Sequence, residues 1–173
     1  MHQSITAAAD TILAYTVNRA GGAPGVVAMA TDRSGNFYEG AAGVREMGKA
    51  DLMTTDSVML LASCTKALVG VALMQGVEEG LVSLADPARE FTPEIADIQV
   101  LEGFGPDGEA RLRKPKSDIT VEQLMLHTSG FGYDFFSDDL LRYRTAKEIP
   151  SILTCTFAAV RDVLLHDPGA AWT

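Results

Sequence analysis

The sequence predicts an α/β fold in which an antiparallel sheet with flanking helices is followed by a mostly helical region. Strand-like runs separated by a turn occupy the first third of the chain, and an all-apolar helical segment and shorter helical patterns follow. The 173 residues suffice for one domain with a substantial core, but not for two of comfortable size. We expect residues 1–84 to belong to the α/β part and residues 85–173 to the mostly helical region.

The first third of the chain is predicted to form one helix and three strands. Apolar residues recur at near-helical spacing over residues 5–19, and two glycines then stop the pattern. The runs 25–31 and 37–44 are strand-like, and the five residues between them are typical of a hairpin loop. A third apolar run, 57–61, predicts a short strand that leads directly into a serine.

The middle of the chain is predicted to contain a buried helix and a second hairpin. Residues 65–79 are apolar on nearly every side, which is typical of a buried helix, and Gly80 ends the pattern. The Asp-Pro pair at 86–87 offers an N-cap followed by proline at the first helical position. Residues 100–114 alternate around a Gly-Pro-Asp-Gly turn, which predicts the second hairpin.

Short helices are expected in the last third. Thr120 and Gln123 form a capping-box pattern that opens a helix ending near His127. Two further helices are expected over residues 138–144 and 157–166. This region is therefore expected to consist mainly of helices and loops.

The composition restricts the partners that the protein can have. The net charge of −9 and the pI near 4.7 argue against nucleic acid, because its phosphates would be repelled. No apolar run approaches the roughly 20 residues that span a bilayer, and the N-terminus is a poor secretory signal. Cys64 and Cys155 are the only cysteines, so we expect no disulfide framework and a cytoplasmic location. The three histidines lack metal-ligand spacing, and we expect no metal site.

A Ser-x-x-Lys pair, Ser63 and Lys66, stands where a predicted strand ends and the apolar helix begins. A serine hydroxyl is a weak nucleophile until a base takes its proton. On a helix, a lysine three residues later lies one turn away on the same face, and desolvation lowers the pKa of a lysine amine so that it becomes a usable base. The N–H groups at the helix start can stabilise the oxyanion that forms when the serine attacks a carbonyl.

An ordinary structural interpretation also accounts for the pair. Ser63 would be an N-cap, and Lys66 a solvated residue of the first turn. Chance alone supplies about 0.7 such pairs in a chain of this length, so the spacing leaves both interpretations open. The position at the start of an all-apolar helix favours the catalytic interpretation, because the pair then faces something other than plain solvent.

Longer blocks around this pair resemble a known superfamily. Ala-Ser-Cys-Thr-Lys-Ala-Leu at 62–68 and Glu-Gly-Leu-Val-Ser-Leu-Ala-Asp-Pro at 79–87 resemble the β-lactamase and penicillin-binding-protein superfamily. The blocks 100–108 and 126–136, the second of which contains His-Thr-Ser-Gly, look more narrowly like the family VIII carboxylesterases. These are class C β-lactamase-like serine hydrolases that act mainly on esters. The resemblance covers essentially the whole chain.

The resemblance implies an acyl-enzyme on Ser63, with Lys66 as its partner and no cofactor. In that family a tyrosine from a later motif shares the base role, and a C-terminal strand completes the oxyanion hole. Residues 167–173 match the run directly before that tyrosine, so the tyrosine and the C-terminal strands and helix of the fold have no counterpart in this chain. We therefore expect a truncated or interrupted chain, completed by the missing C-terminal part or by a second polypeptide.

Aromatic residues late in the chain are candidates for contact with the substrate. Tyr133 is a candidate for the acyl pocket, whereas Phe135 and Phe136 could equally be core. Trp172 is expected to wall the site beside the absent tyrosine. His127 is interpreted as a structural hydrogen-bonding residue, because no acid partner is evident and the family uses lysine and tyrosine.

These observations lead to a main expectation and two alternatives. The complete protein is expected to be a serine hydrolase that cleaves small carboxylic esters. A β-lactamase or D-amino-acid peptidase would use the same chemistry, because substrate choice lies in the shape of the pocket. The third possibility is an inactive fragment that only assembles with a partner chain.

Overall fold

The computed structural model describes residues 2–160 and 162–173. Its internal contacts divide the chain into two compact units, Met1–Ala62 and Ser63–Thr173. The division that we expect after residue 84 differs from these units and stays a prediction.

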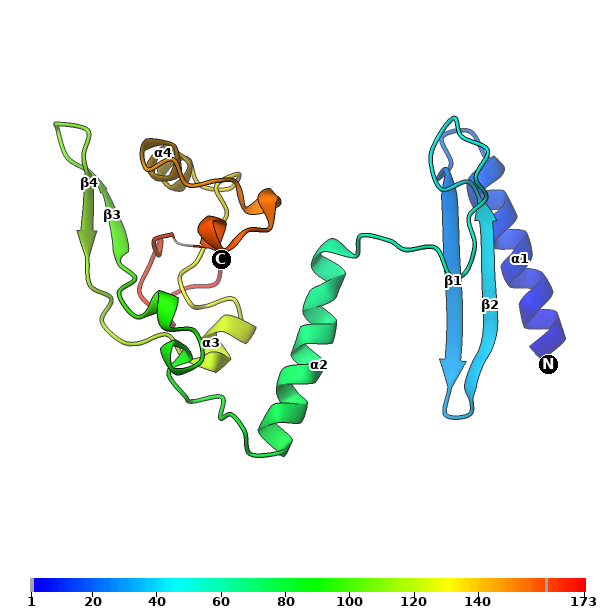
Figure 1. Cartoon of the computed structure of the whole chain (residues 1–173), viewed down its shortest axis with the longest axis horizontal. Coiled ribbons are helices and arrows are strands. Elements are labelled where there is room, and N and C mark those ends of the chain that lie inside the picture. The colour runs from blue at the N-terminus through cyan, green and yellow to red at the C-terminus, as the bar shows by residue number, and fades with distance from the viewer. Residues whose placement is uncertain (1, 161) are drawn as a thin grey trace. The chain divides into compact units, whose positions relative to one another are not determined.

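The first unit consists of one helix packed along a two-stranded hairpin (Figure 1). Both the N-terminal helix and the first hairpin are thereby confirmed, and their bounds are α1 (His2–Asn18), β1 (Gly25–Asp32) and β2 (Gly35–Gly43). The strands pair antiparallel, with Gly25 opposite Gly43 and one irregularity after Ala30.

Tyr38 joins the helix to the hairpin. Its side chain is buried, and its hydroxyl donates to Asp10 Oδ1 at 2.9 Å. Burial raises the pKa of Tyr38, and the neighbouring carboxylate of Asp10 adds to this shift. Gly40 leaves the room that the ring needs, because a Cβ there would lie 2.2 Å from the Tyr38 hydroxyl oxygen.

The short strand expected over residues 57–61 is wrong. Val58 and Leu60 are 100% and 93% exposed, and the run has no regular secondary structure. A strand requires a neighbour that satisfies its backbone N–H and C=O groups. No strand within residues 2–160 and 162–173 pairs with this run.

The second unit begins with the long helix and continues with a hairpin and two short helices. These elements confirm the helix expected over 65–79, the hairpin expected over 100–114 and the helices expected near 120–127 and 138–144. Their bounds are α2 (Thr65–Glu78), β3 (Val100–Phe104), β4 (Ala110–Arg113), α3 (Val121–Met125) and α4 (Asp138–Ala146). The Asp-Pro pair at 86–87 precedes only a three-residue 3₁₀ turn, Ala88–Glu90.

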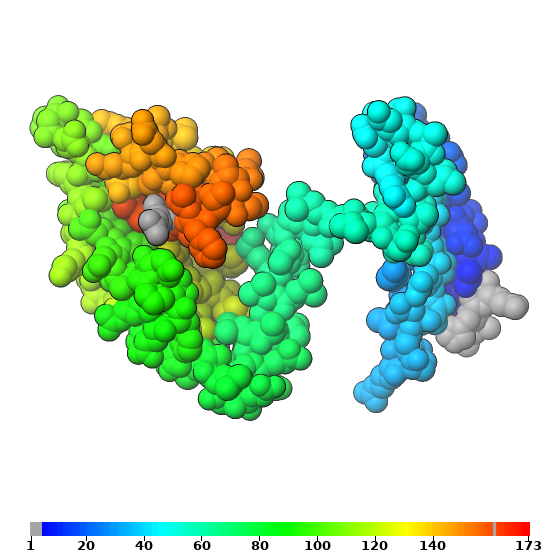
Figure 2. All heavy atoms as spheres, in the orientation of Figure 1, coloured from blue at the N-terminus to red at the C-terminus, as the bar shows by residue number. Residues whose placement is uncertain are grey.

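The expectation that α2 is buried is wrong for this chain. No residue of the helix is buried, and Leu68, Val69 and Val71 are more than half exposed. Figure 2 shows the helix as a column at the edge of the second unit. The physical reason is a lack of neighbours: Met125 of α3 contributes to a recess along one side of the helix, and no other helix or strand of the described residues packs extensively against it.

The core of the second unit lies on the two sides of β3. Val100 packs with Leu164 in one buried cluster, whereas Leu101 packs with Val163 and Leu140 in the other. Neighbouring residues of an extended chain point to opposite faces, which explains how 163 and 164 serve different clusters.

The helix expected over residues 157–166 is therefore wrong for most of its length. A 3₁₀ turn covers Phe157–Val160, and residue 161 lies outside the described residues. Beyond it, Leu164 forms a parallel bridge to Val100, and its carbonyl accepts the backbone N–H of Leu101 at 2.8 Å. Pairing with β3 overrides the local helical pattern.

Two kinds of feature are absent from the part of the chain that the structure describes. No helix there combines the length and apolarity needed to cross a membrane. No three side chains of histidine, cysteine, aspartate or glutamate gather there in a way that could hold a metal ion.

Candidate active site

The structure brings Ser63 and Lys66 together at the start of α2. Lys66 Nζ donates to Ser63 Oγ across 3.1 Å, and both side chains are exposed. Ser63 lies in the 3₁₀ turn Ala62–Cys64, and α2 continues directly from it, so the two residues are one turn apart. Ala62 has a φ of 45°, a left-handed conformation that costs an alanine about 1–2 kcal/mol. The chain therefore reaches the serine through a sharp, strained turn.

This arrangement holds two of the groups that nucleophilic chemistry at a serine uses. A neutral amine at hydrogen-bonding distance can accept the proton of the serine hydroxyl as the oxygen attacks a carbonyl carbon. The N-cap residue of α2, Cys64, makes no side-chain cap hydrogen bond. The first N–H groups of the helix and its dipole thus favour negative charge beside Ser63.

A cavity of about 400 Å³ opens in the second unit. Its walls are largely apolar, with a few polar groups among them, as is typical of small-molecule sites. The lining residues are Thr92, Ile95, Leu124, His127, Ser129, Phe131, Gly132, Tyr133, Arg144, Ile152, Ala159, Val160, Asp162 and Thr173.

The other candidate residues differ in their relation to this cavity. Tyr133 lines it, and its ring stacks on Phe135 with centroids 4.9 Å apart. Phe136 packs edge-on against the Tyr133 ring and is 85% exposed. Trp172 is 76% exposed and is not one of the lining residues. His127 does line the cavity, and its backbone carbonyl accepts the N–H of Thr173 at 3.0 Å.

Gly130 gives a physical reason for the glycine in the His-Thr-Ser-Gly block. Its φ is 100°, and a Cβ there would lie 2.4 Å from the carbonyl oxygen of His166. The Gly130 carbonyl accepts the N–H of Leu165 at 2.7 Å. The block therefore packs closely against the segment that carries Leu164, and only glycine fits there.

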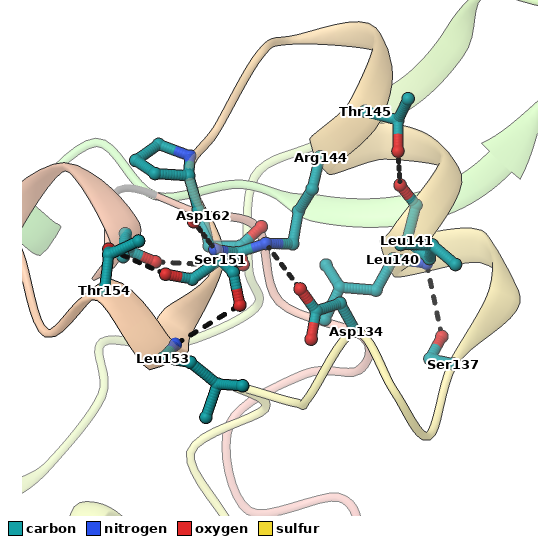
Figure 3. A network of polar contacts seen from close by, with 12 residues as sticks. Asp134, Ser137, Leu140, Leu141, Arg144, Thr145, Ser151, Leu153, Thr154 and Asp162 are labelled. Carbon is teal, nitrogen blue, oxygen red and sulfur yellow. Dashed lines mark hydrogen bonds and ion pairs between the residues drawn. The ribbon is translucent and has the colours of Figure 1, made fainter.

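A buried arginine beside the cavity was not predicted from the sequence. Arg144 of α4 is 4% exposed, and its guanidinium forms ion pairs with Asp162 and, at 3.4 Å, with Asp134 (Figure 3). It also donates to the carbonyls of Ala159, at 3.1 Å, and Pro150. Burial raises the pKa of Asp162, and the charge of Arg144 offsets only part of this effect. No spacing in the sequence signals this cluster, because Arg144 lies on α4 and its two acidic partners come from different loops.

A second ionic cluster fixes the last residues of the chain. Arg113 of β4 forms two hydrogen bonds with the Asp167 carboxylate, at 2.6 and 3.0 Å, and a third with Glu102 at 2.9 Å. His166 Nε2 lies 2.8 Å from the hydroxyl oxygen of Thr173. The segment 166–173 is thus held against β4 and reaches the cavity at Thr173.

Comparison with known proteins identifies the family. Residues 6–173 match the family model described as Beta-lactamase. The chain belongs to the β-lactamase family. The acyltransferase mokF of Monascus pilosus is 36% identical over 89% of this chain, and the lovastatin esterase of Penicillium rubens is 33% identical over 86% of it. This β-lactamase-family chain spans only 39% and 38% of the length of these two relatives.

A solved structure shares the fold. The unliganded simvastatin synthase from Aspergillus terreus superimposes with a TM-score of 0.79 and 31% sequence identity. The match covers 96% of this chain and 44% of that chain. The expected β-lactamase-like fold is thereby confirmed for the part that this β-lactamase-family chain represents.

Proposed function

We propose that the complete protein cleaves carboxylic esters through an acyl-enzyme on Ser63. By complete protein we mean the assembly, or the longer chain, in which the family fold is whole. The observation that carries the proposal is the 3.1 Å contact between Lys66 Nζ and Ser63 Oγ at the start of α2, in a chain of the β-lactamase family. A lovastatin esterase among its relatives supports the choice of an ester substrate.

The proposed reaction has two halves. Ser63 Oγ attacks the carbonyl carbon while its proton moves to the Lys66 amine, and the alcohol then leaves with a proton from that amine. Water attacks the acyl-enzyme in the second half and releases the carboxylic acid. The family tyrosine would share the base role.

Transfer of the acyl group to a second alcohol is the other candidate. A relative that is named an acyltransferase favours it, and the first half of the reaction would be identical. Only the acceptor differs, because an alcohol replaces water in the second half. Rates on a short-chain nitrophenyl ester, with and without an added alcohol, separate the two candidates. A chromogenic cephalosporin in the same assay tests the β-lactamase alternative.

Two aromatic residues are proposed to contact the substrate. The position of Tyr133 on the cavity wall supports its role in the acyl pocket. Trp172 is exposed, and we propose that it walls the site once the rest of the fold is present. Cys64 and Cys155 are both free and exposed, which is compatible with the proposed cytoplasmic location.

We also propose that the exposed apolar face of α2 is covered in the complete protein, either by the further part of the family fold or by a second chain. The coverage of 38–39% of the relatives' lengths supports this proposal. Covering the face would also desolvate the neighbourhood of Ser63 and Lys66, which strengthens electrostatic interactions there. The alternative is that the chain is inactive and only assembles with a partner, and the ester assays would then show no turnover.

The test is substitution of the nucleophile. Ser63→Ala in the complete protein should lower ester turnover by about 10⁴-fold or more, because no other group replaces the attacking oxygen. A serine-reactive phosphonate should add to the parent protein at Ser63, as read by intact mass and peptide mapping, and should not add to the variant. Ser83→Ala, at an exposed serine of the same unit, is the matched control and should keep the adduct. Turnover that survives Ser63→Ala would contradict the proposal.

A further inference from the structure

Two separate segments contribute to the lining of the cavity. One is the loop that follows α3 and contributes Phe131, Gly132 and Tyr133. The other runs from Ile152 to Asp162 and contributes Ile152, Ala159, Val160 and Asp162. Within the described residues neither segment contains a β-strand, so no backbone ladder joins them.

Arg144 joins these two segments. Its guanidinium pairs with Asp134 in the first segment and with Asp162 and the Ala159 carbonyl in the second (Figure 3). Asp134 is the residue next to Tyr133, and Ala159 itself lines the cavity. The guanidinium is a planar fork: its two terminal nitrogens donate to Ala159, Asp162 and Pro150, whereas its Nε faces Asp134 as an ion pair at 3.4 Å without a hydrogen bond. A lysine ammonium has three donors at one point and cannot span the same set.

The cavity is connected to the helix of the nucleophile through α3. Met125 faces α2, where its Cε lies 3.4 Å from the position that a Cβ on Gly70 would take, and it lines a recess there with Ala67. Leu124, its neighbour, lines the cavity instead. An acyl group stays bonded to Ser63 in the acyl-enzyme, and the cavity lies in the same compact unit as that serine.

We infer that the cavity holds the acyl chain of the ester, and that Arg144 is the positioning residue that sets the usable length of the cavity by holding its two segments together. This inference rests on the proposed function and specifies its substrate class, namely esters with an apolar acyl chain of medium length. The largely apolar walls suit an apolar chain, and the volume of about 400 Å³ lies within the range of small-molecule pockets.

Filling the cavity tests the first part of the inference. The complete protein with Ile152→Phe is compared with the parent on the nitrophenyl esters of acetate, butyrate and octanoate. We expect the ratio of kcat/KM for octanoate to that for acetate to fall by about tenfold, mainly through KM, because the added ring takes the space of several methylenes. Leu153→Phe is the matched control, since Leu153 is adjacent, 81% exposed and outside the lining, and its ratio should stay within about twofold. Equal ratios in the two variants would overturn the inference.

Arg144→Lys and Arg144→Met test the positioning role. Both should lower the octanoate-to-acetate ratio through KM, because a lysine keeps the charge but not the fork. A merely structural role would lower the rates on all three esters together and leave the ratio unchanged, and that result in folded variants would overturn the role. If neither variant folds, Asp134→Asn takes their place, because it weakens only the 3.4 Å contact between Arg144 and Asp134. Its octanoate-to-acetate ratio is then compared with that of the parent.

A binding measurement separates failure of this inference from failure of the proposed function. Nitrophenyl octanoate is titrated into Ser63→Ala and into Ser63→Ala with Ile152→Phe. Weaker binding to the double variant supports the acyl site. Equal binding to two inactive variants overturns the acyl site alone, whereas hydrolysis by Ser63→Ala overturns the proposed function.

Discussion

Among single residues, Asp167 shows how charge holds the last segment of the chain in place. The guanidinium of Arg113 lowers the pKa of the Asp167 carboxyl far below its usual range, and the N–H of Lys116 adds to the effect. A carboxyl whose pKa is lower in the folded than in the unfolded state stabilises the fold above the unfolded value and loses that contribution as the pH falls through the folded value. Asp167 is therefore expected to stabilise the fold at neutral pH.

Asp167→Asn should lower the free energy of unfolding at neutral pH, and the difference from the parent should shrink as the pH falls below about 4, where the unfolded carboxyl takes up its proton. Urea unfolding at a series of pH values measures this difference. Asp97→Asn, at an exposed aspartate of the same unit, should show little difference at any pH. A loss in Asp167→Asn that does not change with pH would mean that charge is not the cause.

The same scale shows which site residues could be predicted from the sequence. Ser63 and Lys66 are three residues apart where a 3₁₀ turn leads into α2, so local geometry alone predicts their contact, and the structure has it at 3.1 Å. Arg144 could not be predicted, because its partners Asp134 and Asp162 come from loops whose course no periodic pattern encodes. The chemical roles of these residues stay predictions until the substitutions above are made.

At the scale of elements, the capping box of α3 is a case where sequence and structure agree in detail. The Thr120 hydroxyl accepts the N–H of Gln123 at 3.2 Å, and the Gln123 side chain accepts the N–H of Thr120 at 3.0 Å. With only five residues, Val121–Met125, the helix is too short to be stable without such help. It separates the recess beside α2 from the cavity, so its stability bears on both.

Thr120→Ala should lower the free energy of unfolding by about 1 kcal/mol, whereas Thr120→Ser, which keeps the hydroxyl, should cost only a few tenths of a kcal/mol. Chemical denaturation of the two variants measures the difference. A serine variant as unstable as the alanine variant would show that the threonine methyl group, and not the cap, supplies the stability.

Elements whose signals are local were predicted correctly, and elements that depend on distant partners were not. The hairpin β3–β4 and the short helix α3 have turn and cap residues of their own. The run 57–61 has the composition of a strand but no pairing neighbour in the described chain. Residues 163–164 have a helical pattern but are drawn into pairing with β3. Only the tertiary fold decides such cases.

For the whole molecule, the apolar face of α2 is the feature on which sequence and structure disagree, because the sequence predicts its burial and the structure exposes it. An apolar helix predicts burial on all sides, and in this chain Leu68, Val69 and Val71 lie 61%, 57% and 62% exposed. Burying one such side chain contributes about 1.5–3 kcal/mol, so a stable fold gains by covering this face. The chain spans about two fifths of the length of its relatives, which supports the proposal that the rest of the β-lactamase-family fold covers this face.

Leu68→Ala in the complete protein decides whether that face is covered. A leucine truncated inside a packed core costs about 2–5 kcal/mol of unfolding free energy, because the lost transfer energy is joined by the cost of a cavity. At a position as exposed as Leu68 is in this chain, the same change costs within about 0.5 kcal/mol. Glu78→Ala, at a charged and exposed position of the same helix, should stay within about 0.5 kcal/mol in either case and serves as the control. We expect the larger loss for Leu68→Ala by chemical denaturation, and a loss no larger than that of Glu78→Ala would show that the helix of the nucleophile stays open to solvent.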